Sequence, residues 1–410
     1  MERYNKELEA LAASGNMRSL HHLFREGKYL YGDVFGADGK PVQMLNLSSN
    51  DYLGISCDAS LREEFMGLPL TKELLFGSGS SRLITGNSME YDGFELQLKR
   101  DYKKGGALLF NGGYHANSGV LPAIASERDL ILADKLVHAS IIDGITLAAS
   151  YSRVRSIRFR HNDLAQLQNL IENNAGKYEK IFVVVESIYS MDGDVADLLK
   201  LVELKKSYPK ANIVLYVDEA HAVGVRGENG LGLAEELGCI ADIDIIVGTL
   251  GKALASMGAY IICSEELRQY LINKVRPLIF TTALPPVNIA WSCFVWDKMK
   301  QMKQQRGHLK EISELLRGAV EEMRKKVSVN SSAAGGISLL FNDTQIVPYI
   351  VGESSAAISL AEHLQREGFY VLPIRPPTVP QGTARLRFSL TANIERKEVE
   401  LLCALLKNLK

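Results

Sequence analysis

The sequence has no long uninterrupted apolar run and no excess of charge of either sign. Charged residues or glycines interrupt every long apolar stretch well short of the roughly 20 residues that a transmembrane helix needs. Lysine and arginine number 47 against 48 aspartates and glutamates, so the net charge of -1 gives the chain no general attraction for nucleic acid or an anionic membrane. We therefore expect a protein that spans no membrane and binds no nucleic acid.

Cysteine is also scarce, and the first residues do not resemble a secretory signal. Segment 1–16 is charged and amphipathic and has no apolar centre. The cysteines are odd in number, scattered and without the close pairing of a metal site. They are Cys57, Cys239, Cys263, Cys293 and Cys403. We expect no metal, a reducing compartment and a cytoplasmic location.

What the sequence does contain is an alternation of short apolar runs and helical stretches, from about residue 56 to residue 286. Such alternation predicts an α/β fold, with a central, mostly parallel sheet and helices on both faces. In that architecture, ligands bind at the carboxyl ends of the strands. The predicted strands are Ala107–Phe110, Leu130–Ala133, Ile157–Phe159, Ile181–Glu186, Ile213–Asp218, Ile243–Val247 and Ala259–Cys263.

The regions before and after the alternation have different patterns, so we predict three domains. Residues 1–55 are an N-terminal helix, Glu2–Ala13, a polar arm and a short hairpin with its turn at Ala37–Gly39. Residues 56–286 are the large domain, and 287–410 a smaller α+β domain. Its predicted elements are a long helical region, Val287–Lys326, strands near Ile337–Leu340, Ile346–Val351 and Arg385–Leu390, and helices near Ser355–Glu367 and Glu395–Leu406.

One predicted strand, Ile243–Val247, leads to a lysine just past its carboxyl end. Lys252 stands between apolar residues on both sides, and burial disfavours the ammonium form of a lysine. A neutral lysine is a nucleophile towards aldehydes. The alternative is an ordinary solvated lysine in the loop after a strand.

A carboxylate and an imidazole follow the preceding predicted strand. Asp218 ends that strand, and His221 stands three residues later. A carboxylate at the end of a buried strand needs a partner, because an unpaired buried charge is costly. A protonated pyridine nitrogen would be such a partner, and His221 could reach an oxygen on the same ring. A buried aspartate paired with a structural arginine is the alternative.

Other strand ends add groups that suit the same ligand. Gly112 and Gly113 open a helix whose backbone N–H groups could bind phosphate, His138 could stack on an aromatic ring, and Glu186 ends the most apolar strand. An amine, a carboxylate, a stacking histidine and a phosphate cradle together point to pyridoxal 5′-phosphate (PLP). A dinucleotide fits badly, because no G-x-G-x-x-G follows the early strands and Lys252 would have no role.

A series of short motifs resembles the α-oxoamine synthases, a family of PLP enzymes with the aspartate aminotransferase fold, fold type I. The string Ile374–Arg387 resembles the branch of the family in biotin synthesis, the 8-amino-7-oxononanoate synthases, more than the glycine-using branches. The resemblance spans nearly the whole chain. The motifs are SSNDYLG at Ser48–Gly54, GSGSS at Gly77–Ser81, DKLVHAS at Asp134–Ser140, SMDGD at Ser190–Asp194, VDEAH at Val217–His221, GTLGK at Gly248–Lys252 and TTALPP at Thr281–Pro286.

The resemblance implies the roles of the cofactor contacts. Lys252 would carry PLP as a Schiff base and transfer protons, Asp218 would pair with the pyridine nitrogen, and His138 would stack on the ring. His221 and Ser190 would contact the phenolic oxygen. The implied catalytic residues are therefore Lys252, His138, Asp218 and His221. The phosphate contacts would be Gly113, Tyr114 and Thr249, with Thr281 and Thr282 from the neighbouring subunit of a homodimer.

The resemblance also implies the substrate contacts and two departures from the family pattern. Arg375 would bind the carboxylate of the amino acid, and the residues lining the substrates would be Asn50 and Glu186, with Arg18 and Thr378 for the acyl substrate. Tyr91 replaces a usual histidine, and His115 replaces a usual small residue. The packing of the early helix and the acyl channel should therefore differ locally from the family.

The implied reaction is the decarboxylative condensation of L-alanine with a pimeloyl thioester, carried by CoA or acyl carrier protein. A glycine-using synthase, such as 2-amino-3-ketobutyrate CoA ligase, would need the same Lys252 and Asp218 and is the alternative. A catalytically silent subunit that pairs with an active partner is a third hypothesis. The presence of Lys252, Asp218 and His221 together argues against it.

Overall fold

The chain folds into two compact units in a computed structural model that describes residues 2–32, 34–36, 39–328 and 343–408. Unit 1 comprises Met1–Asp58, Ser190–Asp194 and Gly307–Lys410, and unit 2 comprises Ala59–Tyr189 and Val195–Arg306. The N-terminal residues thus group with the C-terminal ones. The three-domain division stays a prediction, because units defined by contacts need not fold independently.

Unit 2 is built on a seven-stranded sheet in the order β4-β10-β9-β8-β7-β5-β6. Strand β10 runs antiparallel to both of its neighbours, and the other neighbouring strands are parallel, which confirms the predicted mostly parallel sheet. Six consecutive buried residues make β7 a two-sided core strand, as in other sheets covered by helices on both faces. The strands are β4 (Gly106–Phe110), β5 (Leu130–Asp134), β6 (Arg155–Phe159), β7 (Ile181–Glu186), β8 (Ile213–Asp218), β9 (Ile245–Thr249) and β10 (Ala259–Cys263).

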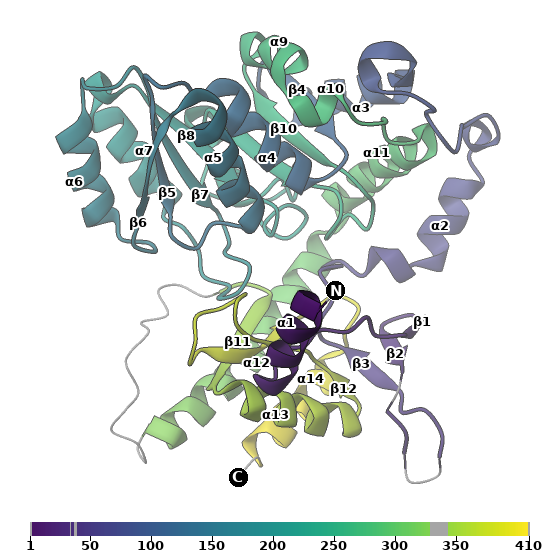
Figure 1. Cartoon of the computed structure of the whole chain (residues 1–410). Coiled ribbons are helices and arrows are strands. Elements are labelled where there is room, and N and C mark those ends of the chain that lie inside the picture. The colour runs from purple at the N-terminus through teal and green to yellow at the C-terminus, as the bar shows by residue number, and fades with distance from the viewer. Residues whose placement is uncertain (1, 33, 37–38, 329–342, 409–410) are drawn as a thin grey trace. The chain divides into compact units, whose positions relative to one another are not determined.

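Helices cover both faces of this sheet (Figure 1). One face packs against α4, α5 and α9 through a continuous apolar core. On the other face, Tyr260 of β10 contacts the rings of Tyr102 from α3 and Trp296 from α11. The helices are α2 (Ala59–Met66), α3 (Met89–Tyr102), α4 (Gly113–Ile124), α5 (Ala139–Ser152), α6 (Leu164–Asn174), α7 (Leu198–Ser207), α8 (Leu233–Glu236), α9 (Glu265–Lys274), α10 (Arg276–Ile279) and α11 (Pro286–Gln301).

Unit 1 joins strands from both ends of the chain. A four-stranded sheet has the order β1-β2-β3-β12, and a three-stranded sheet has the order β11-β14-β13. The N-terminal strand β3 pairs in parallel with β12, so the first and last parts of the sequence share one sheet. The strands are β1 (Phe24–Glu26), β2 (Tyr29–Tyr31), β3 (Met44–Asn46), β11 (Ile346–Gly352), β12 (Phe369–Tyr370), β13 (Pro373–Ile374) and β14 (Ala384–Ser389), and the helices are α1 (Glu2–Ala13), α12 (Lys303–Ser328, whose first residues belong to unit 2), α13 (Ser354–Arg366) and α14 (Arg396–Lys407).

Several predicted elements need correction. The polar arm contains the β1–β2 hairpin, and the long helical region is broken at Met302 into α11 and α12. Ala37 and Asp38 of the predicted turn, and the predicted strand Ile337–Leu340, lie outside the described residues. Among the helices that the structure does describe, none combines the length and apolarity needed to cross a membrane.

Candidate active site

Lys252 and His221 are hydrogen-bonded at the carboxyl edge of the unit 2 sheet. Lys252 follows β9 in the loop to β10, which is closed where the Leu250 amide donates to the Gly258 carbonyl. Its Nζ atom lies 2.8 Å from Nε2 of His221. His221 is buried, whereas Lys252 is half-buried, so the amine can meet a ligand while a buried imidazole holds it.

Asp218 ends the adjacent strand, β8, and is only 5% exposed. Its Oδ1 atom accepts the Ala220 amide hydrogen at 2.9 Å, and its Oδ2 atom accepts Nδ2 of Asn117 at 2.7 Å. Both donors are neutral, and in the described part of the chain no arginine forms an ion pair with this carboxylate. A cationic ring nitrogen would supply the missing positive charge.

His138 caps the start of α5 and belongs to the same electrostatic cluster. Its Nδ1 atom accepts the Ser140 amide hydrogen at 3.2 Å, so this nitrogen carries no proton. Burial lowers the pKa of the imidazole, Asp218 raises it and Lys252 lowers it again, with burial the largest effect. Although burial of the imidazole has the largest effect on its pKa, His138 keeps enough exposed surface to meet a ligand. A neutral imidazole of this kind suits stacking on a ring.

Glu186, at the end of β7, faces the register position of Asp218 on β8. Burial raises the pKa of its carboxyl well above the ordinary 4.5, and Asp218 raises it further, whereas Lys252 and the His138 amide oppose the shift. Its Oε1 atom is buried without a hydrogen-bond partner in the described structure. An orphaned buried oxygen beside an amine and a second carboxyl indicates room for a ligand group.

The predicted phosphate contacts gather near the same edge, but the side chains have other partners. Gly113 is the first residue of α4, a methyl group there would meet nothing within 4 Å, and free N–H groups at a helix start suit an anion. The hydroxyl of Tyr114 donates to Asp143. The hydroxyl of Thr249 donates to the Gly258 carbonyl at 3.3 Å. A phosphate contact from either hydroxyl therefore stays a prediction.

The segment with Thr281 and Thr282 is tied to the GSGSS motif. Ser78 donates to the Ala283 carbonyl at 2.7 Å, and the Ala283 amide donates to the Ser80 carbonyl at 2.9 Å. Thr281 is half-buried and Thr282 is exposed. Two motifs about 200 residues apart in sequence thus form one surface of unit 2.

The predicted substrate residues other than Glu186 lie in unit 1. Nη2 of Arg18 donates to Oγ1 of Thr378 at 3.0 Å, across 360 positions of sequence. The guanidinium of Arg375 contacts the Gly15 carbonyl, which places the N-terminal helix end beside it. The two predicted acyl contacts are therefore brought together.

Sequence reasoning missed two buried arginines of β14. Arg387 donates to Oδ1 of Asn50 at 3.2 Å and to the carbonyl of Ser190, and Arg385 pairs with Asp192. These bonds hold the SMDGD segment and Asn50 within unit 1. The sequence did contain a signal for these arginines, because they alternate with apolar residues in the strand and so share one of its faces.

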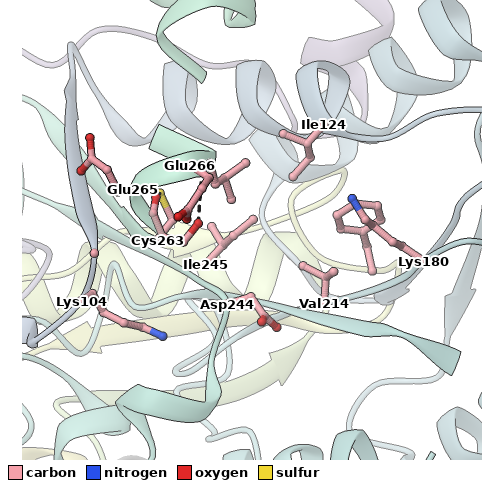
Figure 2. Close-up of a pocket in the computed structure, with 13 residues that line it drawn as sticks. Lys104, Ile124, Lys180, Val214, Asp244, Ile245, Cys263, Glu265 and Glu266 are labelled. Carbon is pink, nitrogen blue, oxygen red and sulfur yellow. Dashed lines mark hydrogen bonds between the residues drawn. The ribbon is translucent and has the colours of Figure 1, made fainter. Parts of the chain in front are cut away.

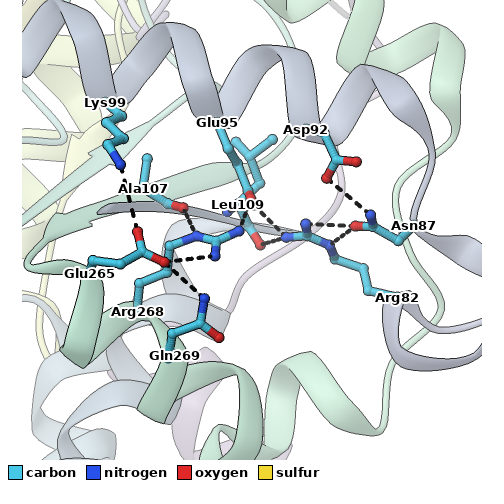
Figure 3. Close-up of polar contacts among 10 residues, drawn as sticks. All are labelled: Arg82, Asn87, Asp92, Glu95, Lys99, Ala107, Leu109, Glu265, Arg268 and Gln269. Atoms are coloured by element: carbon cyan, nitrogen blue, oxygen red, sulfur yellow. Dashed lines mark hydrogen bonds and ion pairs between the residues drawn. The ribbon is translucent and has the colours of Figure 1, made fainter. Parts of the chain in front are cut away.

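Tyr91, which replaces the histidine usual in the family, is buried in the core of unit 2. Its hydroxyl accepts the Leu284 amide hydrogen at 2.8 Å, and the guanidinium of Arg82 lies 4.0 Å from its ring centre. Figure 3 shows how Arg82 and Arg268 bind the two oxygens of buried Glu95, at 2.6 and 2.9 Å. Tyr91 thus anchors the segment that carries Thr281 and Thr282.

Two cavities of unit 2 have linings that include neither Lys252, His221 nor Asp218. One, of about 610 Å³, lies at the amino ends of β7, β8 and β9, where Lys104, Lys180 and Asp244 line it (Figure 2). Strands of five or six residues separate this end from Asp218 by roughly 16–20 Å, and none of the predicted site residues lines it. The other, of about 400 Å³, is lined by His115 and Thr281 among others.

The residues of unit 2 fit PLP. An accessible amine, a buried carboxylate with only neutral donors, a neutral imidazole and an orphaned carboxyl oxygen meet at one sheet edge. This donor set matches an aldehyde, a pyridinium and its phenolic oxygen.

Comparison with known proteins also indicates a PLP enzyme. The family model for aminotransferase class I and II matches residues 42–406. Proteins of Glaesserella parasuis and Haemophilus influenzae Rd, both provisionally named 8-amino-7-oxononanoate synthase, are 48% identical over 399 residues, which cover 97% of this chain and 98% of each relative.

Solved structures are similar over most of the chain. Serine palmitoyltransferase of Sphingomonas wittichii has a TM-score of 0.84 at 28% identity, covering 99% of this chain and 96% of that one. The S. paucimobilis enzyme, solved with bound PLP, has a TM-score of 0.83 at 25% identity, with the same coverage. The 8-amino-7-oxononanoate synthase of Francisella tularensis has a TM-score of 0.72 at 26% identity, covering 89% and 97%. The chain therefore belongs to the aminotransferase class I and II family, and it is a PLP-dependent enzyme of the α-oxoamine synthase type with fold type I.

Proposed function

We propose that the protein is an 8-amino-7-oxononanoate synthase, which condenses L-alanine with a pimeloyl thioester. The observation that carries the choice within the family is the hydrogen bond between Arg18 and Thr378, the two residues that the biotin-branch resemblance assigns to the acyl substrate. The names of the relatives at 48% identity support the same substrate.

The proposed reaction breaks two bonds and forms two at the alanine Cα. The Cα atom loses its proton, bonds to the acyl carbon and displaces the thiol, then loses its carboxylate as CO₂ and regains a proton. PLP supplies an aldehyde for the substrate amine and a cationic ring that draws electron density from Cα. All remaining tasks fall to side chains of this chain.

Lys252 is the proposed proton carrier. Its Nζ atom would take the Cα proton of the bound substrate, and His221 holds the Lys252 amine at 2.8 Å through Nε2. Asp218 keeps the ring nitrogen cationic with its buried negative charge. His138 would lie against the ring, and Glu186, whose neutral form is favoured because burial raises its pKa, would line the amino-acid side.

The remaining contacts are proposed from the resemblance. Arg375 binds the alanine carboxylate and Asn50 lines the substrate, while Arg387 fixes the Asn50 amide at 3.2 Å. The phosphate contacts are Gly113, Tyr114 and Thr249, and Ser190 and His221 contact the phenolic oxygen. Arg375 would have to exchange the Gly15 carbonyl for the substrate carboxylate.

A homodimer is the proposed assembly. Large apolar side chains are exposed on the two segments that hydrogen bonds join, 75–84 and 280–283, and patches of this kind mark protein interfaces. We name this surface the apolar patch; it consists of Leu75, Phe76, Leu83, Ile84 and Phe280. Thr281 and Thr282 follow it directly, so a partner covering the patch would receive both hydroxyls near its own phosphate site.

The substrate assignment is tested by mass spectrometry of the product. Purified protein with PLP is incubated with pimeloyl-CoA and either L-alanine, glycine or L-serine, and thiol release is followed in parallel. Formation of 8-amino-7-oxononanoate with alanine, and little release with glycine, is the expected result. Pimeloyl-acyl carrier protein serves as the second donor.

Other outcomes of this assay would replace the proposal. Faster release with glycine and acetyl-CoA would identify a 2-amino-3-ketobutyrate ligase, with the roles of Lys252 and Asp218 unchanged. Activity with serine and a long-chain acyl-CoA would identify a serine palmitoyltransferase. PLP-loaded protein that releases no thiol from any donor would support the silent-subunit hypothesis.

The dimer is tested by light scattering on the variant Ile84→Asp/Phe280→Asp. Two charges on the apolar patch should produce monomers that retain less PLP, because the threonines of the partner are lost. Leu199→Asp, at an exposed apolar position on α7, is the control and should stay dimeric. An unaltered dimer in the double variant would contradict the assigned surface.

A further inference from the structure

Asn117 lies on α4, five residues after the glycine that precedes this helix, and it is only 2% exposed. Its Nδ2 atom donates to Oδ2 of Asp218 at 2.7 Å and to Oγ of Ser140 at 3.0 Å. A buried amide with both donors in use is a deliberate feature, since burying it unpaired would be costly. No role for Asn117 follows from the reaction described above.

The orientation of this amide is fixed from the other side by Tyr216 of β8. The Tyr216 hydroxyl donates to Oδ1 of Asn117 at 2.7 Å. Burial and the nearby Asp218 raise the pKa of this hydroxyl well above its ordinary value, so it keeps its proton and remains a donor. An amide whose oxygen accepts from Tyr216 must direct its NH₂ group towards Asp218.

Ser140 extends the same network to His138. Because the Ser140 hydroxyl accepts from Asn117, its own hydrogen is available for Nδ1 of His138, 2.7 Å away. Nδ1 also accepts the Ser140 amide hydrogen, so the ring proton is confined to Nε2. The tautomer of His138 and the position of the Asp218 carboxylate thus depend on one amide.

Close packing of α4 on α5 holds this network in place. The two helices lie side by side on one face of the sheet (Figure 1). A Cβ atom at Gly144 would stand 2.4 Å from the Asn117 carbonyl oxygen, so only glycine permits the observed approach. Ser140, one turn before Gly144, is thereby brought within hydrogen-bonding distance of the Asn117 amide.

We propose that Asn117 is a positioning residue for the cofactor, which aligns the Asp218 carboxylate and the His138 imidazole as one unit through Tyr216 and Ser140. It acts through these side chains and need not touch PLP itself. Without the Asn117 amide, Asp218 could still bind a cationic ring. Its carboxylate would then no longer be held in one orientation by Asn117.

The main test uses Asn117→Asp, which keeps the side-chain shape and replaces the NH₂ donor by a second carboxyl oxygen. The dissociation constant of PLP is measured by equilibrium dialysis between pH 6.5 and 9. Two carboxyls at hydrogen-bonding distance share a proton, which removes negative charge from Asp218 at the acid end. The other titratable groups described around Asp218 include Glu186, His138, Lys252, Tyr216 and Glu219, and all five are unchanged in the variant.

We expect PLP to bind about tenfold more weakly or worse at pH 6.5, the factor for losing a hydrogen bond to a charged group, with the difference narrowing as pH rises. Asn273→Asp, at an exposed site on α9, is the control. Unchanged affinity, or a loss of equal size at every pH, would overturn the proposal. This readout does not depend on which amino acid and thioester the enzyme uses, so it is separate from the proposed function.

A second pair of variants keeps the test decisive where Asn117→Asp does not fold. Tyr216→Phe removes the hydroxyl that orients the amide, and Ser140→Ala removes the hydroxyl that accepts from Asn117 and links it to His138. Each should weaken PLP binding about threefold, as expected for one neutral hydrogen bond. Ser152→Ala, at the other end of α5, loses a hydroxyl that donates to the Ala148 carbonyl and serves as control. PLP affinities equal to that of the parent in both variants would overturn the proposal.

Discussion

Glu186 and Asp218 occupy paired positions at the carboxyl ends of the adjacent parallel strands β7 and β8. Both carboxyls are buried. In the proposed site only Asp218 pairs with a cation, the ring nitrogen of PLP. Burial is the largest cause that raises the pKa of Glu186 well above 4.5, and the neighbouring Asp218 raises it further. The neutral form of Glu186 is therefore favoured beside Asp218.

This pair gives the folded protein a specific pH dependence. A carboxyl whose pKa is higher in the folded than in the unfolded chain contributes stability below its unfolded pKa, and this contribution is lost as pH rises through the folded value. We expect the melting temperature of cofactor-free protein to fall less between pH 5 and pH 9 in Glu186→Gln than in the parent. Parallel curves would contradict the shift, and Glu203→Gln, at an exposed position, is the control.

Lys252→Ala should reduce turnover by roughly a thousandfold or more, because the proton carrier and covalent anchor are lost together. The protein should also lose its yellow, borohydride-sensitive colour, which visible spectroscopy detects. His221→Ala should keep the colour and lose roughly ten- to a hundredfold in kcat, because the amine 2.8 Å away loses its partner. Lys210→Ala, an exposed lysine, should match the parent. Full activity in Lys252→Ala would refute the proposed mechanism.

Arg18 and Thr378 should act as a pair on the acyl substrate. Arg18→Ala and Thr378→Ala should each raise KM for the thioester several-fold and leave KM for the amino acid unchanged. Because the two side chains share a bond of 3.0 Å, the double variant should lose less than the sum, by about 0.5–1.5 kcal/mol. Arg62→Ala on α2 is the control, and additive effects would show that the bond plays no part in binding.

Glu95→Leu should destabilise unit 2 strongly. Glu95 is buried, and its carboxylate binds Arg82, Arg268 and the Leu109 amide, so its removal leaves two guanidinium groups without their shared partner. Breaking a buried ion pair in this way costs about 3–5 kcal/mol. Urea denaturation should show that loss, whereas Glu265→Leu, which removes partly exposed ion pairs, should cost about 1 kcal/mol or less.

The sequence predicted the large sheet well because its strands are buried on both faces and read as continuous apolar runs. Every predicted strand from Ala107–Phe110 to Ala259–Cys263 is present, with ends shifted by at most two residues. The antiparallel orientation of β10 could not be predicted from the sequence, because an apolar run looks the same in a parallel and in an antiparallel strand. Strands as short as Phe369–Tyr370 show no periodicity at all, and the exposed strand Phe24–Glu26 has no buried face to mark it.

The site was predictable where function places polar residues just past apolar strands. Asp218, Glu186 and Lys252 stand out in this way, and the structure brings them into electrostatic contact. Asn117 gave no such signal, because it lies within a helix and its importance depends on Tyr216 and Ser140, which are distant in sequence. Which partner a buried polar group finds is a property of the tertiary fold and not of its neighbours in sequence.

The parallel pairing of β3 with β12 joins Leu45 to Phe369, 324 residues later in the chain. A ribosome that adds roughly 5–20 residues per second needs roughly 16–65 s to make that stretch. All residues of unit 2 have been synthesised by Arg306, well before β12 exists. During synthesis, the unit 2 residues proposed to hold the cofactor can therefore assemble first, and the Arg18–Thr378 contact forms only as translation finishes.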